Sequence, residues 1–179
     1  NSHDYVRNNR RAIAERTSLK VFGVDFTSAP SRRKAITYAV CELRGRQLTH
    51  IESGRLESFD EFAAFLRKPG PWVAGFDFPF GQPRKLIDNL KWDPDWESYV
   101  NQLSRLCMKD WERLLKEYRT PRPKGDKQHF RETDHRAKSK SPMMMYGVPV
   151  GRMFFRGAHR LLESGVSVVP CRPIDSEDR

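Results

Sequence analysis

Long hydrophobic runs are absent from this chain, and two common catalytic motifs are absent with them. No apolar run approaches the ~20 residues that a helix needs to cross a bilayer, and no signal peptide is recognisable. We therefore expect no membrane partner and a cytoplasmic location. The sequence also has no Walker-type phosphate loop and no Gly-x-Ser-x-Gly elbow, which argues against P-loop phosphoryl transfer and serine hydrolysis.

Cysteine is scarce and widely spaced. The three cysteines are Cys41, Cys107 and Cys171. An odd number at such distances is typical of reduced thiols in a cytosol-like compartment rather than of a disulfide framework. A structural zinc site needs closely spaced Cys or His ligands, so the cysteines do not indicate one.

Positive charge is what the chain has in excess. It carries 33 Lys and Arg against 23 Asp and Glu, a net charge of +10, in 179 residues of which 37% are hydrophobic. That length is enough for one domain with a core, and the excess charge favours a phosphate-bearing polyanion such as nucleic acid as partner. The segment 119–140 is rich in Arg and Lys and contains Pro and Gly, so we expect a basic loop, either phosphate-binding or simply solvated.

Two apolar segments each end in an aspartate. Residues 19–26 predict a buried strand that carries Asp25 at its end, and residues 72–77 predict a second strand that ends at Asp77. The carboxyl ends of parallel strands form the ligand-binding edge of open α/β sheets. A close carboxylate pair repels itself unless it shares a proton or holds a cation, so the two aspartates suggest a divalent metal site.

The intervening pattern predicts a mixed sheet. Residues 34–43 alternate and residues 47–52 return after a turn, which predicts an antiparallel three-stranded meander with the first strand. Ser58 and Glu61 form a capping-box pattern that opens a helix, and the strand after it should run parallel to the first or third strand. Further patterns predict a long helix starting at Asp93 and reaching Tyr118, a helix over about 150–163, and a fifth strand over 166–170.

This arrangement resembles the ribonuclease H-like fold, and more narrowly the family of predicted nucleases known as domain of unknown function 429. The matching segments are residues 21–25, residues 75–81, and residues 131–136 ahead of a Met-rich stretch. The resemblance implies an α/β domain over 19–179 after a basic arm at 1–18, with a helical and basic-loop insertion at about 84–148. Family members continue into further helices and another acidic position, which implies a C-terminally incomplete domain.

The resemblance implies a metal-dependent nuclease, a hydrolase with a two-metal carboxylate mechanism. Asp25, Asp77 and Asp134 would be catalytic and hold Mg²⁺ or Mn²⁺, since hard cations prefer oxygen ligands, and His135 would shuttle a proton. Phosphates of the nucleic acid would be bound by basic residues in and just after the third segment: Arg131, Arg136, Lys138 and Lys140.

Two other functions remain open from the sequence. The chain could be a non-catalytic nucleic-acid-binding domain of the same fold, which the basic loop would favour. It could also be an actin-like phosphotransferase, because residues 25–28 loosely match that class's first phosphate motif, although the glycine usual in that turn is absent. Asp134 could also serve only to balance Arg131 and Arg136.

Overall fold

The structure, a computed structural model, describes residues 18–174. The arm predicted over residues 1–18 lies outside the described residues except for Ser18. The chain divides into two compact units, the first ending at Asp77 and the second starting at Phe78. The two units are described in turn.

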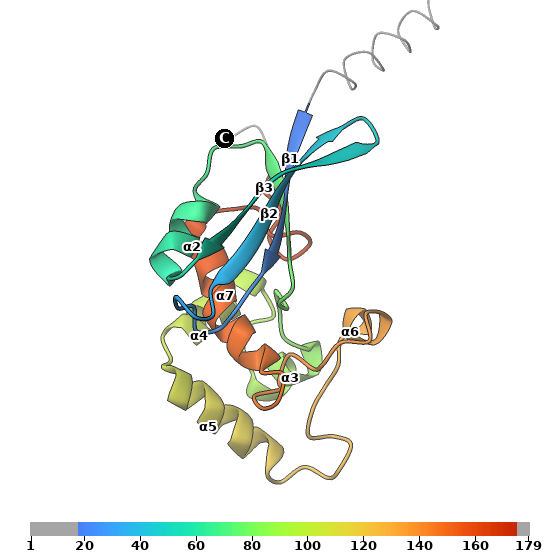
Figure 1. The fold of residues 1–179 in the computed structure, drawn as a ribbon. Coiled ribbons are helices and arrows are strands. Elements are labelled where there is room, and N and C mark those ends of the chain that lie inside the picture. The colour runs from blue at the N-terminus through green and yellow to red at the C-terminus, as the bar shows by residue number, and fades with distance from the viewer. Residues whose placement is uncertain (1–17, 175–179) are drawn as a thin grey trace, which may run out of the picture. The chain divides into compact units, whose positions relative to one another are not determined.

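The first unit is a four-stranded mixed sheet. Its strands are β1 (Ser18–Asp25), β2 (Ile36–Arg44), β3 (Gln47–Leu56) and β4 (Trp72–Phe76), in the order β3-β2-β1-β4 (Figure 1). The pairs β1–β2 and β2–β3 are antiparallel, and β1–β4 is parallel. The expected α/β class and the meander are thereby confirmed. Of the two strands to which the fourth was predicted to run parallel, the first is its partner.

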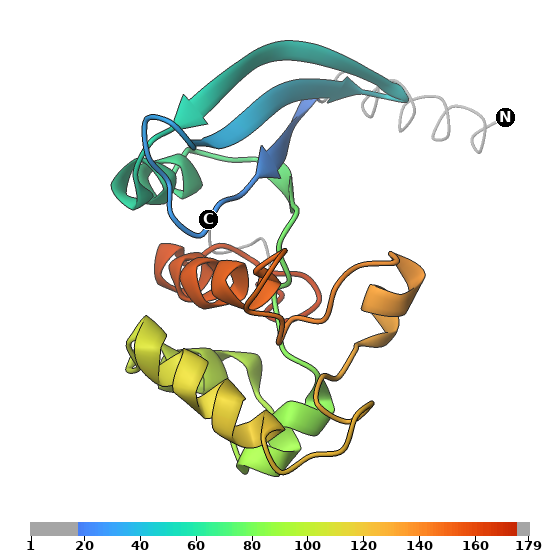
Figure 2. The same ribbon diagram turned by 60° about the horizontal axis from the view of Figure 1, so that its bottom comes forward.

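One face of this sheet is covered by helix α2 (Phe59–Leu66), as Figure 2 shows. The helix begins where predicted, because the Ser58 hydroxyl accepts a hydrogen bond from the Glu61 backbone N–H at 3.1 Å. The Glu61 carboxylate accepts from the N–H of Glu57 at 2.6 Å rather than from that of Ser58. Two side-chain hydrogen bonds therefore cap the N-terminus of α2. The bond to the Glu61 carboxylate comes from the N–H of Glu57, one residue before the Ser58 N–H that a capping box uses.

Aromatic side chains fill the space between α2 and the sheet. Phe62 and Phe65 of α2 are buried, and their rings lie 5.3 Å from Phe26 and 5.1 Å from Phe22 in edge-to-face geometry. Each such ring removes a large apolar area from water, and edge-to-face pairs add a further ~0.5–1.5 kcal/mol. This packing fixes the end of β1, where Asp25 lies.

The opposite face of the sheet, which we call the open face, carries small side chains. Pairing between strands brings Ser53, Ala39, Gly23 and Gly75 into one row across all four strands. A β-bulge interrupts β3, because Val40 pairs with Glu52 while Cys41 pairs with His50 and Ile51 is left without a partner. The residues of β3 before and after the bulge therefore pair with β2 in registers that differ by one residue.

The second unit is helical. Its elements are α3 (Arg84–Leu90), α4 (Trp96–Ser104), α5 (Met108–Arg119), α6 (Glu132–Arg136) and α7 (Val150–Ser164). Helix α7 packs against α4 and α5 (Figure 2), and Trp111 and Phe154 are completely buried between them. At Gly157 of α7, a Cβ atom would collide with the ring of Phe78, so this glycine allows the first residue of the unit to pack against the helix.

The predicted long helix is wrong as a single element. Helix α4 ends at Ser104, and α5 starts after Cys107, whose N–H and thiol both donate to the Asp110 carboxylate. Helix α4 also starts two residues later than predicted. Its cap is Asp95, which accepts a hydrogen bond from the Ser98 N–H, rather than Asp93. The apolar period continues across the break because both helices bury their apolar faces in the same core.

The predicted fifth strand is also wrong. Val168 forms only an isolated bridge, exchanging backbone hydrogen bonds of 2.8 and 2.6 Å with Arg172. Pro170 lacks an N–H group and cannot continue a ladder, so the valine-rich segment closes on itself in a tight turn. In the basic segment, which was expected to be mostly loop, the five residues of α6 form a short helix. No helix in the described part of the chain has both the length and the apolar composition to cross a membrane.

Candidate functional site

Asp25 and Asp77 meet at the end of the parallel strands β1 and β4. Val24 pairs with Phe76, and the next residue of each chain segment carries the carboxylate. The Asp77 N–H donates to Val24 O at 3.3 Å, and the N–H of Phe26 donates to Asp77 Oδ1 at 2.8 Å. Backbone hydrogen bonds therefore hold both side chains at one edge of the sheet, where the sequence predicted a carboxylate pair.

The two carboxyl groups of the pair interact unfavourably when both are charged. Removal of water from the Asp77 carboxyl raises its pKa, the Phe26 N–H opposes this, and the charge and hydrogen bonding of Asp25 raise the pKa further. A hydrogen bond between two carboxyl groups requires a proton on one of them. The carboxylate pair thus retains a proton more readily than two separate aspartates would, which is one of the two ways to relieve repulsion.

The other way is a cation, and none of the described side chains supplies one. Within residues 18–174, neither Asp25 nor Asp77 forms an ion pair with a Lys, Arg or His side chain. In the same range, no group of three or more His, Cys, Asp and Glu side chains is arranged to hold a metal ion. The pair therefore offers two oxygen-donor side chains for a divalent cation, and the described residues add no third.

A groove on the open face begins at Asp25. It has a volume of about 590 Å³ and is lined by residues of β1, β2 and β3: Gly23, Asp25, Thr37, Tyr38, Ala39, Ser53, Gly54 and Arg55. A Cβ atom added to Gly23 would meet nothing within 4 Å. The small side chains therefore leave space beside the carboxylate pair along the sheet surface.

Basic side chains lie at the same end of this sheet. Arg55 is opposite Thr37, which is opposite Asp25, so two strand spacings, roughly 10 Å, separate the Arg55 and Asp25 backbones. The Arg55 guanidinium donates to Arg32 O at 2.8 Å, which holds the β1–β2 loop with its exposed Arg33 and Lys34. The sequence analysis missed these residues, although three consecutive basic residues after an acidic strand end were a visible signal.

Asp134, the predicted third metal ligand, has a different environment in the second unit. It is 2% exposed, and Arg131 donates to it from the backbone N–H at 2.8 Å and from the guanidinium at 2.6–3.2 Å. Burial alone would raise the pKa of Asp134, but the Arg131 hydrogen bonds and charge leave it below the ordinary value. Both oxygens are engaged, so Asp134 holds the start of α6, and its role as a metal ligand stays a prediction.

The remaining predicted site residues also belong to the second unit. Arg131 is committed to Asp134 and to Gly81 O, and Arg136 pairs with Glu132 at 3.0 Å. The His135 ring lies 5.2 Å from the ring of Phe130. Lys138 and Lys140 are exposed. Two of the four predicted phosphate-binding side chains are therefore already neutralised by neighbouring carboxylates.

Comparison with known proteins leaves the site to be interpreted from its own residues. No protein-family model, no curated protein and no solved structure matches this chain. The resemblance to the predicted nuclease family therefore rests on the three short segments and on their order along the chain.

Proposed function

We propose that this chain is a divalent-metal-dependent hydrolase of phosphodiesters in nucleic acid, with a ribonuclease H-like sheet as its framework. The observation that carries the proposal is the meeting of Asp25 and Asp77 at the ends of adjacent parallel strands. The strand order β3-β2-β1-β4 supports it, because the fold that the sequence resembles also places its first and fourth strands side by side.

The donor set fits Mg²⁺ or Mn²⁺. Both ions prefer hard oxygen ligands, and Mg²⁺ is commonly held by one or two carboxylates, with water and substrate phosphates completing its shell. Two carboxylates that no cationic side chain among residues 18–174 neutralises are therefore sufficient protein ligands for one hydrated ion. When bound, such an ion would supply an activated water and neutralise charge on a phosphate. A two-metal arrangement with Asp134 stays a prediction.

The residues of this chain would position both ion and substrate. The Phe26 N–H fixes the Asp77 carboxylate at the sheet edge, so the orientation of this ligand is set before a cation displaces the proton of the pair. A phosphodiester backbone would lie in the groove, where Gly23 and Ala39 leave room. Arg55, Arg33 and Lys34 would neutralise the phosphates that flank the carboxylate pair, because exposed guanidinium and ammonium groups release counterions from nucleic acid.

Titration of Mn²⁺ by calorimetry tests this proposal first. The wild-type chain should bind the ion, and Asp25→Asn/Asp77→Asn should not, because the neutral amides keep the hydrogen-bonding shape but lose the charge. A matched control, Asp60→Asn/Asp88→Asn, removes the same charge from exposed helix positions and should bind like wild type. Absence of binding to the wild-type chain would refute the metal site. Cleavage of single- and double-stranded DNA and RNA in Mn²⁺ then identifies the substrate.

A second candidate is a nucleic-acid-binding module without catalysis. It is favoured by one observation, namely that only two carboxylates converge among residues 18–174. For such a module, Asp25→Asn/Asp77→Asn should leave nucleic-acid affinity unchanged or slightly higher, with no cleavage in either protein. For the hydrolase, the same variant should lose cleavage while retaining the affinity that comes from Arg55 and its neighbours.

A further inference from the structure

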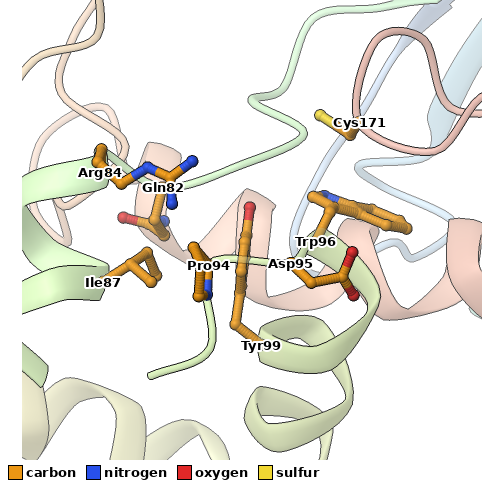
Figure 3. Close-up of a pocket in the computed structure, with 8 residues that line it drawn as sticks. All are labelled: Gln82, Arg84, Ile87, Pro94, Asp95, Trp96, Tyr99 and Cys171. Carbon is orange, nitrogen blue, oxygen red and sulfur yellow. The ribbon is translucent and has the colours of Figure 1, made fainter. Parts of the chain in front are cut away.

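The second unit contains a cavity of about 310 Å³ that the carboxylate site does not involve (Figure 3). It lies where α3 and α4 begin, with Ile87 from α3 and with Pro94, Trp96 and Tyr99 before and within α4. The volume is at the lower end of the ~300–1,000 Å³ range of ligand pockets. It therefore suits one ring system with a substituent rather than a peptide segment.

Gln82 gives this cavity an unused hydrogen-bond acceptor. The side chain lines the cavity and is only 7% exposed. Its Nε2 donates to Pro142 O at 3.1 Å, which fixes the orientation of the amide. Its Oε1 is buried and has no hydrogen-bond partner within the part of the chain that the structure describes. Buried polar atoms are rarely left unpaired, so the carbonyl oxygen favours a ligand with an N–H donor.

Rigid apolar groups form the walls. The Trp96 indole is held in place because its Nε1–H donates to Phe80 O at 2.6 Å. The Tyr99 hydroxyl accepts from the backbone N–H of Gln82, and burial raises the pKa of Tyr99, so this group stays a neutral phenol. Figure 3 shows the Tyr99 ring edge-on between Pro94 and Trp96. Walls of flat, fixed groups favour a planar ligand.

Charge at the mouth favours an anionic substituent. Arg84 is exposed and forms no ion pair with any of residues 18–174. The positive charges of Arg131 and Arg84 both act on the Tyr99 hydroxyl, so the field in the cavity is positive. Asp95 also lines the cavity, but its carboxylate accepts from the Ser98 N–H at 2.9 Å as the cap of α4.

We propose that this cavity binds one nucleotide unit, with the base between the apolar walls, an N–H of the base donating to Gln82 Oε1, and the phosphate at Arg84. The unit can be a free mononucleotide or one residue of a strand, because both present the same base and phosphate. The site requires no metal and no contribution from Asp25 or Asp77. It can therefore be tested separately from the proposed hydrolysis.

The test is calorimetric titration of the full chain in EDTA with the four ribonucleoside 5′-monophosphates, the corresponding nucleosides, inorganic phosphate and short oligonucleotides. At least one monophosphate should bind with a Kd of about 0.1–1 mM, as expected for one small ligand. Arg84→Gln should weaken the monophosphate about fivefold and leave the nucleoside unchanged. Gln82→Met should weaken both about fivefold, because it removes the acceptor and keeps the side-chain length.

Lys109→Gln is the matched control, since it removes one exposed positive charge from α5 and should not alter binding. Tighter binding of oligonucleotides would assign the site to a strand, and equal binding would assign it to a free nucleotide. The proposal is overturned if no monophosphate binds, if inorganic phosphate alone binds as tightly, or if Arg84→Gln behaves like the control. Arg84 is exposed, so its replacement keeps the test valid even if Gln82→Met destabilises the unit.

Discussion

Asp77 in the first unit and Asp134 in the second share one kind of hydrogen bond but have pKa values shifted in opposite directions. Each accepts a hydrogen bond from a backbone N–H, at 2.8 Å from Phe26 and at 2.8 Å from Arg131 respectively. Yet the pKa of Asp77 lies above its ordinary value and that of Asp134 lies below it. Burial raises the pKa of both carboxyl groups, and the neighbour decides whether that rise persists, because Asp77 faces another carboxylate and Asp134 faces a guanidinium.

The comparison separates two uses of the same residue type. A buried carboxylate with a bidentate arginine is already neutralised, and it contributes mainly to holding its own segment. An exposed carboxylate beside a second one is destabilised until a proton or a cation arrives. A sequence motif alone does not distinguish these cases, although the basic neighbours of Asp134 already suggested that it could balance Arg131 and Arg136. The following experiments would break or sharpen the distinction.

The largest expected effect is that of Arg131→Ala. It leaves the Asp134 carboxylate buried without its partner, and breaking such a pair costs about 3 kcal/mol of unfolding free energy. Urea denaturation measures the loss. Arg136→Ala is the control on the same short helix: its exposed pair with Glu132 is worth less than about 1 kcal/mol. Equal losses in the two variants would contradict the structural role of the buried pair.

Asp134→Asn should destabilise the chain by about 2 kcal/mol, because the charge-assisted bonds from Arg131 become weaker. Its Mn²⁺ titration should nevertheless match that of wild type, since the ion is assigned to Asp25 and Asp77. Loss of Mn²⁺ binding in a folded Asp134→Asn protein would instead support the three-carboxylate site that the sequence predicted.

Gly23→Val tests the groove without touching a charged group. A side chain there meets open space, and valine is a better strand residue than glycine, so the unfolding free energy should not fall. The added methyl groups would fill the groove beside Asp25, and nucleic-acid affinity should drop about fivefold, or roughly 1 kcal/mol. Unchanged affinity in fluorescence anisotropy would show that the substrate lies elsewhere.

The smallest effect is the pH dependence of the carboxylate pair. Because the pKa of Asp77 is raised in the folded state, the folded chain binds more protons than the unfolded chain between the unfolded value, about 3.9, and the folded value. Stability is therefore lost as pH rises through that window. Asp77→Asn should be more stable than wild type at pH 7 by roughly 0.5 kcal/mol, given solvent screening, and the difference should vanish below about pH 4. Denaturation curves at several pH values, without divalent ions, measure it.

Much of the first unit was predictable because its signals are local. Apolar runs identified β1 and β4, alternation identified β2, and the Ser58 cap identified the start of α2. The meeting of Asp25 with Asp77 followed from topology, since a strand after a crossover helix tends to lie parallel to a neighbour. The second unit was less predictable, because its helix break at Cys107 and its turn at Pro170 depend on single hydrogen bonds that leave the apolar period unchanged.

The missed site features depend on contacts between distant residues. Arg55 joins Asp25 only through the register of β2 with both its neighbours. The environment of Asp134 depends on which way the Arg131 side chain folds back. Neither composition nor spacing encodes these relations, because each is a choice between side-chain partners that the sequence allows equally.

The bulge at Ile51 determines which side of the sheet displays Arg55. From the Gly45–Arg46 turn, the hairpin starts with Arg44 opposite Gln47, and an uninterrupted ladder would place Arg55 opposite Ile36, on the face that α2 covers. The one unpaired residue moves Arg55 opposite Thr37 instead, so that it shares a face with Asp25. A deletion of Ile51 would therefore straighten the outer strand and leave Arg55 opposite Thr37. A regular ladder that kept Ile51 and paired it would instead turn the guanidinium toward the aromatic core, while every residue of the carboxylate pair kept its place.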